Sequence, residues 1–333
     1  MAPRTASTMQ AWQSRRKGVD GVSLETVSIP SPGPGSALIE VQYAALNFSD
    51  LLMLDDRYQV RPTRPFIPGQ EVAGTVVETG PESRLVPGDR VASKVEWGAF
   101  APWAVVRDDM AMVFDESTDL ASAVALPVAY TTAWVGLVEQ AGLTSSETLL
   151  VHGASGGVGL AAVEIGKAQG AQVIATASTT SKRELALAHG ADAVVGYTEE
   201  GWVDAVQKAS DGHGVDVVFD PVGGIVGEQS LKCLAWDGRF LVVGFASGSV
   251  PKLPAHRLLL QRLQAIGVYW SHDRDREMLE RVGFCIRDLL EEGSIRPHLD
   301  RTYALDELPK ALTSLGDRSA KGKVVLSITG DGS

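Results

Sequence analysis

Residues 148–160 read TLLVHGASGGVGL, a short apolar run that passes into a turn made of small residues. The run Thr148–His152 has the length and apolar content of a buried strand, and a helix is predicted from Leu160 onward. The turn between them has the pattern A-x-G-x-x-G, with Ala154, Gly156 and Gly159 at the small positions. A strand, a turn of this pattern and a helix in succession are typical of dinucleotide-binding proteins.

Each small residue in this turn has a physical role. Ala154 permits the tight turn, Gly156 lets the backbone approach a pyrophosphate, and Gly159 lets the helix pack closely on the strand. The N-terminus of the helix offers free N–H groups and the positive end of a dipole to phosphates, and Gly157 and Val158 of the turn are also predicted to bind the cofactor. The alternative is a turn with a structural role alone.

The fold class follows from what surrounds the turn. From about residue 130 onward, short apolar runs alternate with Ala-rich helical stretches. Six such runs predict a parallel, doubly wound sheet covered by helices on both faces, which makes the chain an α/β protein. The predicted strands are Thr148–His152, Gln172–Ala177, Ala193–Tyr197, Val215–Asp220, Phe240–Phe245 and Gln264–Val268.

The first 115 residues have a different sequence pattern. They are rich in β-strand signals, beginning near Met9, and are punctuated by Pro and Gly. After residue 270 the sequence predicts a helix over Arg274–Glu292 and a last strand over Lys323–Ile328. A segment Ser230–Trp236 also has a helical pattern, and its Cys233 is expected to be a small core residue.

Composition excludes several classes of protein. Thirty basic and 41 acidic residues give the 333-residue chain a net charge of −11, which argues against binding nucleic acid or anionic lipid. Cys233 and Cys285 are the only cysteines, which suits a reducing cytoplasm and excludes a disulfide framework. Residues 120–138 are uncharged, but small and polar residues and Pro127 interrupt them, so a buried helix is predicted rather than a membrane span.

The second predicted strand indicates which cofactor the turn binds. NAD-binding chains usually carry an acidic residue at the end of this strand, but here Ser178 is followed by no acid until Glu184. Ser181 and Glu184 form a capping box that predicts a helix from Lys182, with Lys182 and Arg183 in its first turn. A helix dipole disfavours cations there, and the 2′-phosphate of NADPH would reverse this penalty. The alternative is two solvated surface charges.

The order of motifs along the chain resembles the zinc-free NADPH:quinone oxidoreductases of the medium-chain dehydrogenase/reductase superfamily. The resemblance implies a chaperonin-10-like catalytic domain, residues 1–130 together with 271–333, and an NADPH-binding Rossmann domain, residues 131–270, with NADPH in a cleft between them. It also implies a homodimer formed through the last Rossmann strand, near Gln264–Val268. The motifs are Asn47–Asp50, Ile67–Gly74, the turn Ala154–Gly159, Asp220–Gly224 and Gly238–Gly244.

The chain departs from the zinc alcohol dehydrogenases at the metal ligands. Those enzymes have histidine in a Gly-His-Glu motif where this chain has Gln70, and their cysteine ligand has no counterpart before Cys233. Zinc needs three or four Cys, His or carboxylate ligands at suitable spacing. No metal is therefore expected. The scattered histidines are His152, His189, His213, His256, His272 and His298.

Without a metal, catalysis needs a hydrogen-bond donor for the negative charge that develops on a substrate carbonyl. Asn47 and Tyr58 are the candidates, and Tyr58 lies 11 residues after Asn47, the separation that places a tyrosine beside the substrate in related enoyl-thioester reductases. Phe48 and Asp56 replace the Pro and Gly of those enzymes. Alternatively, Asn47 holds its own loop through an Asx-type bond, and Tyr58 is a loop aromatic that shapes the pocket.

Further cofactor contacts rest on the resemblance alone. Thr132 is placed near the nicotinamide amide, and Tyr197 and Arg318 match positions that hold the adenosine phosphate. Gly244 and Phe245 would border the nicotinamide ribose. Each of these residues also has a structural interpretation, and Arg318 alternatively is a solvated charge.

The sequence thus favours an NADPH-dependent reductase of a small electrophilic substrate, a quinone or an activated alkene. One alternative is an enoyl-thioester reductase, for which Arg57, Arg61 and Arg64 would offer a basic path to an anionic substrate. Another is a redox sensor that binds NADPH without turnover.

Overall fold

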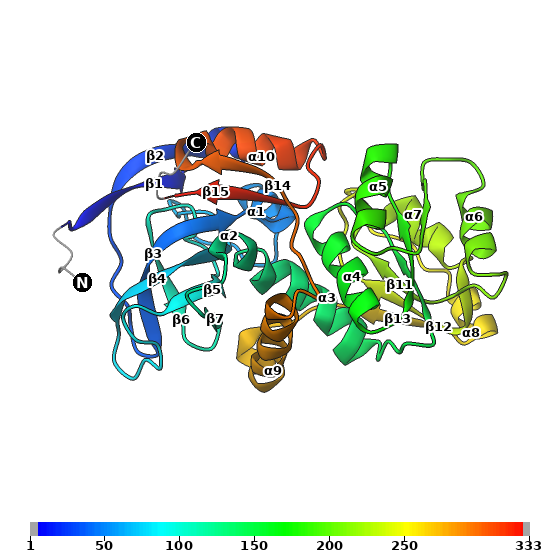
Figure 1. Ribbon diagram of the computed structural model, residues 1–333. Helices are drawn as coiled ribbons and strands as arrows, with labels where there is room; N and C mark the ends of the chain where they lie inside the picture. The colour runs from blue at the N-terminus through cyan, green and yellow to red at the C-terminus, as the bar shows by residue number, and fades with distance from the viewer. Residues whose placement is uncertain (1–5, 329–333) are drawn as a thin grey trace. The chain divides into compact units, whose positions relative to one another are not determined.

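The computed structural model describes residues 6–328, which divide into two compact units (Figure 1). The first unit joins residues 6–128 to residues 297–328, and the second is Ala129–Arg296.

The second unit is built on a six-stranded parallel sheet within residues 148–267. Its spatial order is β10-β9-β8-β11-β12-β13, which confirms the predicted doubly wound fold. The order reverses between β8 and β11, and ligands of such sheets bind at the carboxyl ends of the strands beside this point. The strands are β8 (Thr148–Val151), β9 (Gln172–Thr176), β10 (Ala193–Val195), β11 (Val215–Asp220), β12 (Leu234–Val242) and β13 (Gln264–Gly267).

Helices cover this sheet because each presents an apolar side to it. Helix α4 contacts β8 and β9, α5 contacts β9 and β10, and α8 contacts β12. Fully buried Leu150, Val218 and Phe240 lie in the core of this unit. The helices are α3 (Thr131–Trp134), η3 (Val135–Gln140), α4 (Gly157–Ala168), α5 (Thr180–Ala188), α6 (Trp202–Ala209), α7 (Gly224–Ser230), α8 (Ala255–Gln261) and α9 (His272–Glu291).

The predicted domain division differs from the structure at residues 271–296, which were grouped with the catalytic domain and belong to the second unit. Helix α9 contacts α3 of that unit. The backbone N–H of Arg296 donates to Oε2 of the buried Glu164 in α4 at 3.0 Å, and the Tyr130 hydroxyl donates to the same oxygen at 2.6 Å. Glu164 therefore ties this C-terminal stretch to the second unit.

The first unit is a β-structure in which β3 is central. Strand β3 pairs with β4, β6 and β15, within a sheet whose main order is β14-β15-β3-β4-β5-β7, while β1 and β2 form a separate antiparallel pair. The strands are β1 (Thr8–Ser14), β2 (Val22–Ser28), β3 (Ser36–Ala45), β4 (Glu71–Thr79), β5 (Arg90–Lys94), β6 (Trp103–Arg107), β7 (Ala111–Phe114), β14 (Leu299–Ala304) and β15 (Lys323–Ser327).

Short helices complete this unit. Helix α10 contacts both β14 and β15, as Figure 1 shows, and also contacts α1. Trp12, Leu54 and Leu308 are among the buried residues of this core. The helices are η1 (Val19–Gly21), α1 (Phe48–Leu54), α2 (Leu120–Ala123), η4 (Leu305–Glu307) and α10 (Leu308–Gly316).

The apolar stretch near Pro127 is helical but irregular. Helix α2 ends at Ala123, and Pro127 lies in the π-helical segment η2 (Leu126–Tyr130), so regular helix is interrupted as predicted. Within the described part of the chain, Leu120–Gln140 is the one helical stretch that is long and apolar enough to cross a membrane, by length and composition alone. Of its most apolar window, 67% is buried inside the protein.

Two predicted helix starts are wrong. Helix α4 begins at Gly157, three residues before Leu160. The last residues of the glycine-rich turn are already helical, although glycine has a low helix propensity. Helix α5 begins at Thr180 with Thr179 as N-cap, and the Thr179 hydroxyl accepts from the Lys182 N–H at 3.4 Å. The N-cap thus lies two residues before Ser181, and the predicted capping box of Ser181 with Glu184 does not form the start of this helix.

The predicted helix Ser230–Trp236 is also wrong. Helix α7 ends at Ser230, and β12 already begins at Leu234, which pairs with Val215 of β11. Strand pairing thus overrides the local helical pattern, while Cys233 is fully buried as expected. Strand β12 ends at Val242, so Gly244 and Phe245 lie in the loop that follows it.

Candidate functional site

The dinucleotide turn of the second unit has the geometry that a pyrophosphate needs. Gly156 is the N-cap of α4, and a Cβ at this position would meet only the Gly153 carbonyl oxygen, at 3.5 Å. A ligand can therefore approach the backbone of Gly156 on the side where a Cβ would lie. The N–H groups of Gly157 and Val158, in the first turn of α4, have no partner within a helix, so they suit an anion.

The other small residues hold the turn against the helix. A Cβ at Gly159 would lie 2.2 Å from the Gly153 carbonyl oxygen, so no larger residue fits there without moving backbone. Ala154 is fully buried, and its N–H donates to the Thr176 carbonyl at the end of β9. The turn is thus fixed to two neighbouring strands, and its residues fit a dinucleotide cofactor.

His152 supports this turn through two buried hydrogen bonds, a role that the sequence did not reveal. Its ring nitrogens lie 2.7 Å from the Thr176 hydroxyl and 2.6 Å from the Ser230 hydroxyl. The Ser230 hydroxyl donates to the Val226 carbonyl, so it accepts from His152 Nε2, and Nδ1 accepts from Thr176. Burial lowers the pKa of His152, which agrees with a neutral ring that links β8, β9 and α7.

The end of β9 carries no carboxylate, and polar and basic residues follow it. Ser178 is half-buried two residues after the end of β9, and Lys182 is half-buried in the first turn of α5. Arg183 differs from Lys182: its guanidinium bonds Glu199 at 2.9 Å and the Thr180 hydroxyl at 3.2 Å. Of the two predicted cations, Arg183 is therefore held by an ion pair.

Tyr197 lies in the loop after β10, half-buried against the core of the second unit. Gly196, its neighbour, has no room for a side chain, because a Cβ there would lie 2.2 Å from Glu199 Oε1 and 2.5 Å from Arg183 Nη1. Glu199 and Arg183 thus join the loop after β10 to helix α5, two residues after Tyr197.

The carboxyl end of β11 is rigid. Asp220 Oδ1 accepts from the N–H groups of Val222 and Gly223, and the Asp220 carbonyl accepts from the Gly244 N–H at 3.3 Å. These bonds connect the loops after β11 and β12. Phe245, at 41% exposure, lies in the same loop pair, since a Cβ on Gly223 would approach its ring to 3.1 Å.

Thr132 lies in α3, and its hydroxyl oxygen accepts from Trp270 Nε1 at 3.1 Å. The Trp270 ring in turn packs edge-on against His272, with centroids 5.6 Å apart. Because the Thr132 oxygen accepts this bond, the hydroxyl keeps its own hydrogen as a donor.

In the first unit, strand pairing brings Asn47 together with two buried charges. The β15–β3 register pairs Val325 with Ala45, and its continuation sets Lys323 opposite Asn47. Lys323 Nζ donates to Asn47 Oδ1 at 2.9 Å and to Glu71 Oε2 at 2.6 Å, and Asn47 Nδ2 donates to Glu71 Oε2 at 3.0 Å. The side chains of Lys323 and Glu71 are 5% and 0% exposed.

The buried ion pair between Lys323 and Glu71 has hydrogen-bond partners for its polar atoms. The Val128 N–H donates to the second Glu71 oxygen at 2.7 Å, so both carboxylate oxygens of Glu71 have partners. Hydrogen bonds to charged groups contribute about 1.5–3 kcal/mol each. The Asn47 side chain is therefore held from both ends by Lys323 and Glu71, which sequence reasoning missed as site residues.

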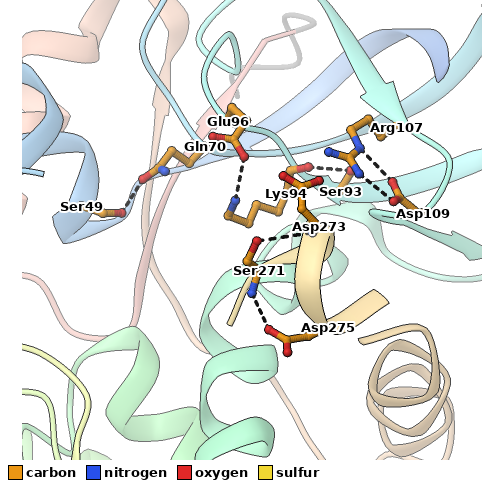
Figure 2. A network of polar contacts seen from close by, with 10 residues as sticks. All are labelled: Ser49, Gln70, Ser93, Lys94, Glu96, Arg107, Asp109, Ser271, Asp273 and Asp275. Atoms are coloured by element: carbon orange, nitrogen blue, oxygen red, sulfur yellow. Dashed lines mark hydrogen bonds and ion pairs between the residues drawn. The ribbon is translucent and has the colours of Figure 1, made fainter. Parts of the chain in front are cut away.

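Gln70 occupies the motif position at which zinc enzymes have histidine. It is almost fully buried, and the Ser49 hydroxyl donates to its Oε1 at 2.5 Å (Figure 2). Within residues 6–328, no three His, Cys, Asp or Glu side chains gather so that they could hold a metal ion. Independence from metal stays a prediction.

Asp50 is a fully buried carboxyl in the first turn of α1. Its Oδ2 accepts from the Asn47 N–H at 2.7 Å, whereas Oδ1 has no hydrogen-bond partner in the described part of the chain. Burial raises the pKa of Asp50 to about 7, and Glu71 acts in the same direction, while the Asn47 N–H and Lys323 lower it.

Tyr58 follows α1 and is half-buried against the core of the first unit. Of the nearby arginines, Arg64 bonds Asp56, the Leu54 carbonyl and the Ser14 hydroxyl.

Arg318 belongs to the first unit, between α10 and β15, and has a left-handed backbone with φ 61°. The other predicted cofactor contacts belong to the second unit.

A turn for a dinucleotide at the switch point of a doubly wound sheet, together with a β-rich unit, defines a nucleotide-binding oxidoreductase of the medium-chain dehydrogenase/reductase superfamily. The sequence profile described as "Alcohol dehydrogenase GroES-like domain" matches residues 33–116, which confirms the chaperonin-10-like unit. The profile described as "Zinc-binding dehydrogenase" matches residues 157–283.

Comparison with known proteins identifies the family within this superfamily. The chain is 32% identical to mouse quinone oxidoreductase-like protein 2 over 96% of its length and 95% of that protein. Quinone oxidoreductase of Pseudomonas syringae has a TM-score of 0.86 at 27% identity, over 96% of this chain and 100% of that one. A mycobacterial protein solved in complex with NADPH has a TM-score of 0.89 at 28% identity, with the same coverage. With such relatives along almost its whole length, the chain belongs to the quinone oxidoreductase family.

Proposed function

We propose that this protein is an NADPH-dependent reductase of quinones or α,β-unsaturated carbonyl compounds that works without a metal ion. The observation that carries the proposal is the Asn47 amide. Lys323 and Glu71 hold it, and the second hydrogen of Asn47 Nδ2 has no partner within residues 6–328. A fixed amide N–H is a suitable donor for an oxygen that gains negative charge.

The choice of NADPH is supported by the end of β9. A carboxylate there would bind the ribose hydroxyl of NADH and repel a 2′-phosphate, but Ser178 and Thr179 follow the strand instead. Lys182, in the first turn of α5, supplies positive charge beside them. The mycobacterial relative that was solved with NADPH agrees with this choice.

The chemistry that NADPH supplies when bound is hydride transfer to an electron-poor carbon. The protein's own residues then have separate tasks. Thr132 keeps a hydroxyl hydrogen with which to donate to the carboxamide of the nicotinamide. Gly244 and Phe245 would border the nicotinamide ribose, and Asn47 Nδ2 would donate to the substrate oxygen.

An enoyl-thioester reductase is the second candidate, and Tyr58 would then act as the acid. The basic path that an anionic thioester needs is weaker than the sequence indicated. Arg64 is occupied by Asp56, Ser14 and a backbone carbonyl, which leaves Arg57 and Arg61 for this role. We therefore place quinones and enones first.

The test is NADPH oxidation, after exhaustive dialysis against a chelator, with a panel of acceptors. The panel contains 1,4-benzoquinone, phenanthrenequinone, 2-cyclohexen-1-one, crotonyl-CoA and a blank without acceptor. We expect turnover with the quinones or the enone that exceeds turnover with crotonyl-CoA and survives chelation.

Three results would contradict the proposal. Preference for crotonyl-CoA would favour the thioester reductase, and loss of activity on removal of a stoichiometric zinc would favour metal chemistry. Tight NADPH binding without turnover of any acceptor would indicate a redox sensor.

A further inference from the structure

The Asn47 amide lies between two opposite charges, and each charge selects one end of it. The ammonium of Lys323 bonds the amide oxygen, and the carboxylate of Glu71 bonds the amide nitrogen. If the amide were reversed, its oxygen would face a carboxylate and its NH2 group would face an ammonium. Both contacts would be repulsive, so the ion pair fixes which end of Asn47 is the donor.

We infer that Lys323, together with Glu71, is a positioning residue that keeps the Asn47 N–H directed as the oxyanion donor. The inference rests on the proposed function, in which Asn47 donates to the substrate oxygen. Lys323 itself contacts Asn47 and Glu71, and it acts on the reaction through Asn47.

The supporting elements make this arrangement rigid. Asn47 follows β3, Glu71 begins β4 and Lys323 begins β15, and β3 pairs with both other strands. The Leu46 N–H also donates to the Val324 carbonyl at 2.9 Å, directly beside the amide. A donor held by side chains on paired strands keeps its geometry better than one on an isolated loop.

Stability alone is a poor explanation for this pair. A buried ion pair can often be replaced by uncharged residues of similar volume without loss of stability, whereas removal of one partner is costly. A third titratable group, Asp50, faces the same cluster and accepts from the Asn47 backbone N–H. The cluster thus concentrates charge around one amide, which suits orientation of that amide.

The test removes both charges together, because Lys323→Met alone would leave Glu71 unpaired and could prevent folding. The variant is Glu71→Gln/Lys323→Met. The glutamine side chain keeps an oxygen that can accept from the Val128 N–H, but its NH2 group then faces Asn47 and favours the reversed amide. Arg239→Met/Glu147→Gln is the matched control, since it removes a part-buried ion pair in the second unit.

With 2-cyclohexen-1-one, we expect the double variant to lose about 10²-fold in kcat, as for loss of one oxyanion donor. The melting temperature of the double variant and its affinity for NADPH should stay close to the parent values. The single variant Lys323→Arg, which keeps the positive charge, should retain most of the parental activity. In an Asn47→Ala background the same double change should cost nothing more, because Lys323 acts through Asn47. The control variant should keep the parental kcat.

Binding of 4-nitrophenolate to the complex with NADP⁺ gives a readout apart from turnover. We expect the double variant to bind this oxyanion at least about tenfold more weakly, as expected from loss of a hydrogen bond to a charged group. Parental kcat and parental phenolate affinity in a folded double variant would overturn the positioning role. An equal loss in the Asn47→Ala background would show a merely structural role. Absence of turnover of 1,4-benzoquinone, phenanthrenequinone and 2-cyclohexen-1-one by the parent would instead contradict the proposed function.

Discussion

At the scale of single residues, Tyr58 separates the two candidate reactions. A quinone is electron-poor and its reduced form is aromatic, so an enzymic acid adds little, whereas a thioester enolate needs one. Tyr58→Phe keeps the ring against the core and removes the hydroxyl. We expect turnover of 1,4-benzoquinone to stay within roughly tenfold of the parent, the effect of one neutral hydrogen bond of about 0.5–1.5 kcal/mol.

The control for this change is Tyr43→Phe, a half-buried tyrosine of β3. Steady-state kinetics with NADPH and 1,4-benzoquinone measures both variants. A loss of a hundredfold in Tyr58→Phe alone, at unchanged NADPH affinity, would move the assignment toward acid-assisted reduction of alkenes.

Asp50 predicts an unusual dependence of stability on pH. Its pKa is about 7 in the folded protein and about 3.9 in an unfolded chain, so between these values the folded state holds a proton that the unfolded state lacks. The contribution of Asp50 to the free energy of unfolding is therefore full below pH 4 and is lost as the pH rises through 7.

Asp50→Asn removes this titration and keeps an oxygen for the Asn47 N–H. Above pH 7 Asp50 is ionised in a buried site and asparagine stays neutral, so we expect the variant to be more stable than the parent by about 1–3 kcal/mol. The difference should shrink toward pH 5. Urea unfolding at several pH values measures it, with exposed Asp204→Asn as the control, and a pH-independent difference would disprove the account.

At the scale of elements, two glycines of the dinucleotide turn should respond differently to alanine. Gly156 has open space in front of it and an ordinary extended backbone, with φ −86° and ψ 167°, so Gly156→Ala should fold normally but weaken NADPH binding. Gly159→Ala would press a Cβ against the Gly153 carbonyl and should lower the melting temperature. Calorimetry and cofactor titration measure the two effects, and the same response from both variants would contradict this geometry.

Local pattern predicted the strands of the second unit well, because buried parallel strands are continuous apolar runs. It failed where longer-range contacts decide an element. Residues 230–236 look helical, but pairing of Leu234 with Val215 makes the start of β12. The cap of α5 is Thr179 rather than Ser181, a difference of two residues that composition does not resolve.

At the scale of the whole molecule, the sequence could not show the partners of Asn47. Lys323 is 276 residues away, and only the pairing of β15 with β3 brings the two together. The one local signal was a lysine at the start of an otherwise apolar strand, Lys323–Ser327. The Asn47 motif was therefore predictable, and its support was not.

We predict that the protein forms a dimer through β13, the edge strand of the second unit. The elements next to β13 carry exposed apolar side chains: Leu259 and Leu260 of α8, which precedes β13, are 78% and 68% exposed, and Trp236 of β12, which pairs with β13, is 61% exposed. Arg262, which follows α8, lies over the Trp236 ring, 5.9 Å from its centroid.

Light scattering should give twice the 35.3 kDa mass of the chain. Leu259→Glu/Leu260→Glu should shift the protein toward monomer, whereas Phe284→Glu, at a 58% exposed site on α9, should not. A parent that is monomeric at micromolar concentration would refute the dimer.

The central claim, reduction that depends on NADPH, is tested most directly by the ratio of kcat/KM for NADPH to kcat/KM for NADH. With 1,4-benzoquinone as acceptor we predict a ratio of about ten or more, since one charge-assisted contact from Lys182 is worth about 1.5–3 kcal/mol. Lys182→Ala should lower this ratio toward one by raising the KM for NADPH alone, while Lys208→Ala on α6 should leave it unchanged. Equal kcat/KM values for both cofactors in the parent, or equal losses for both in Lys182→Ala, would contradict the account.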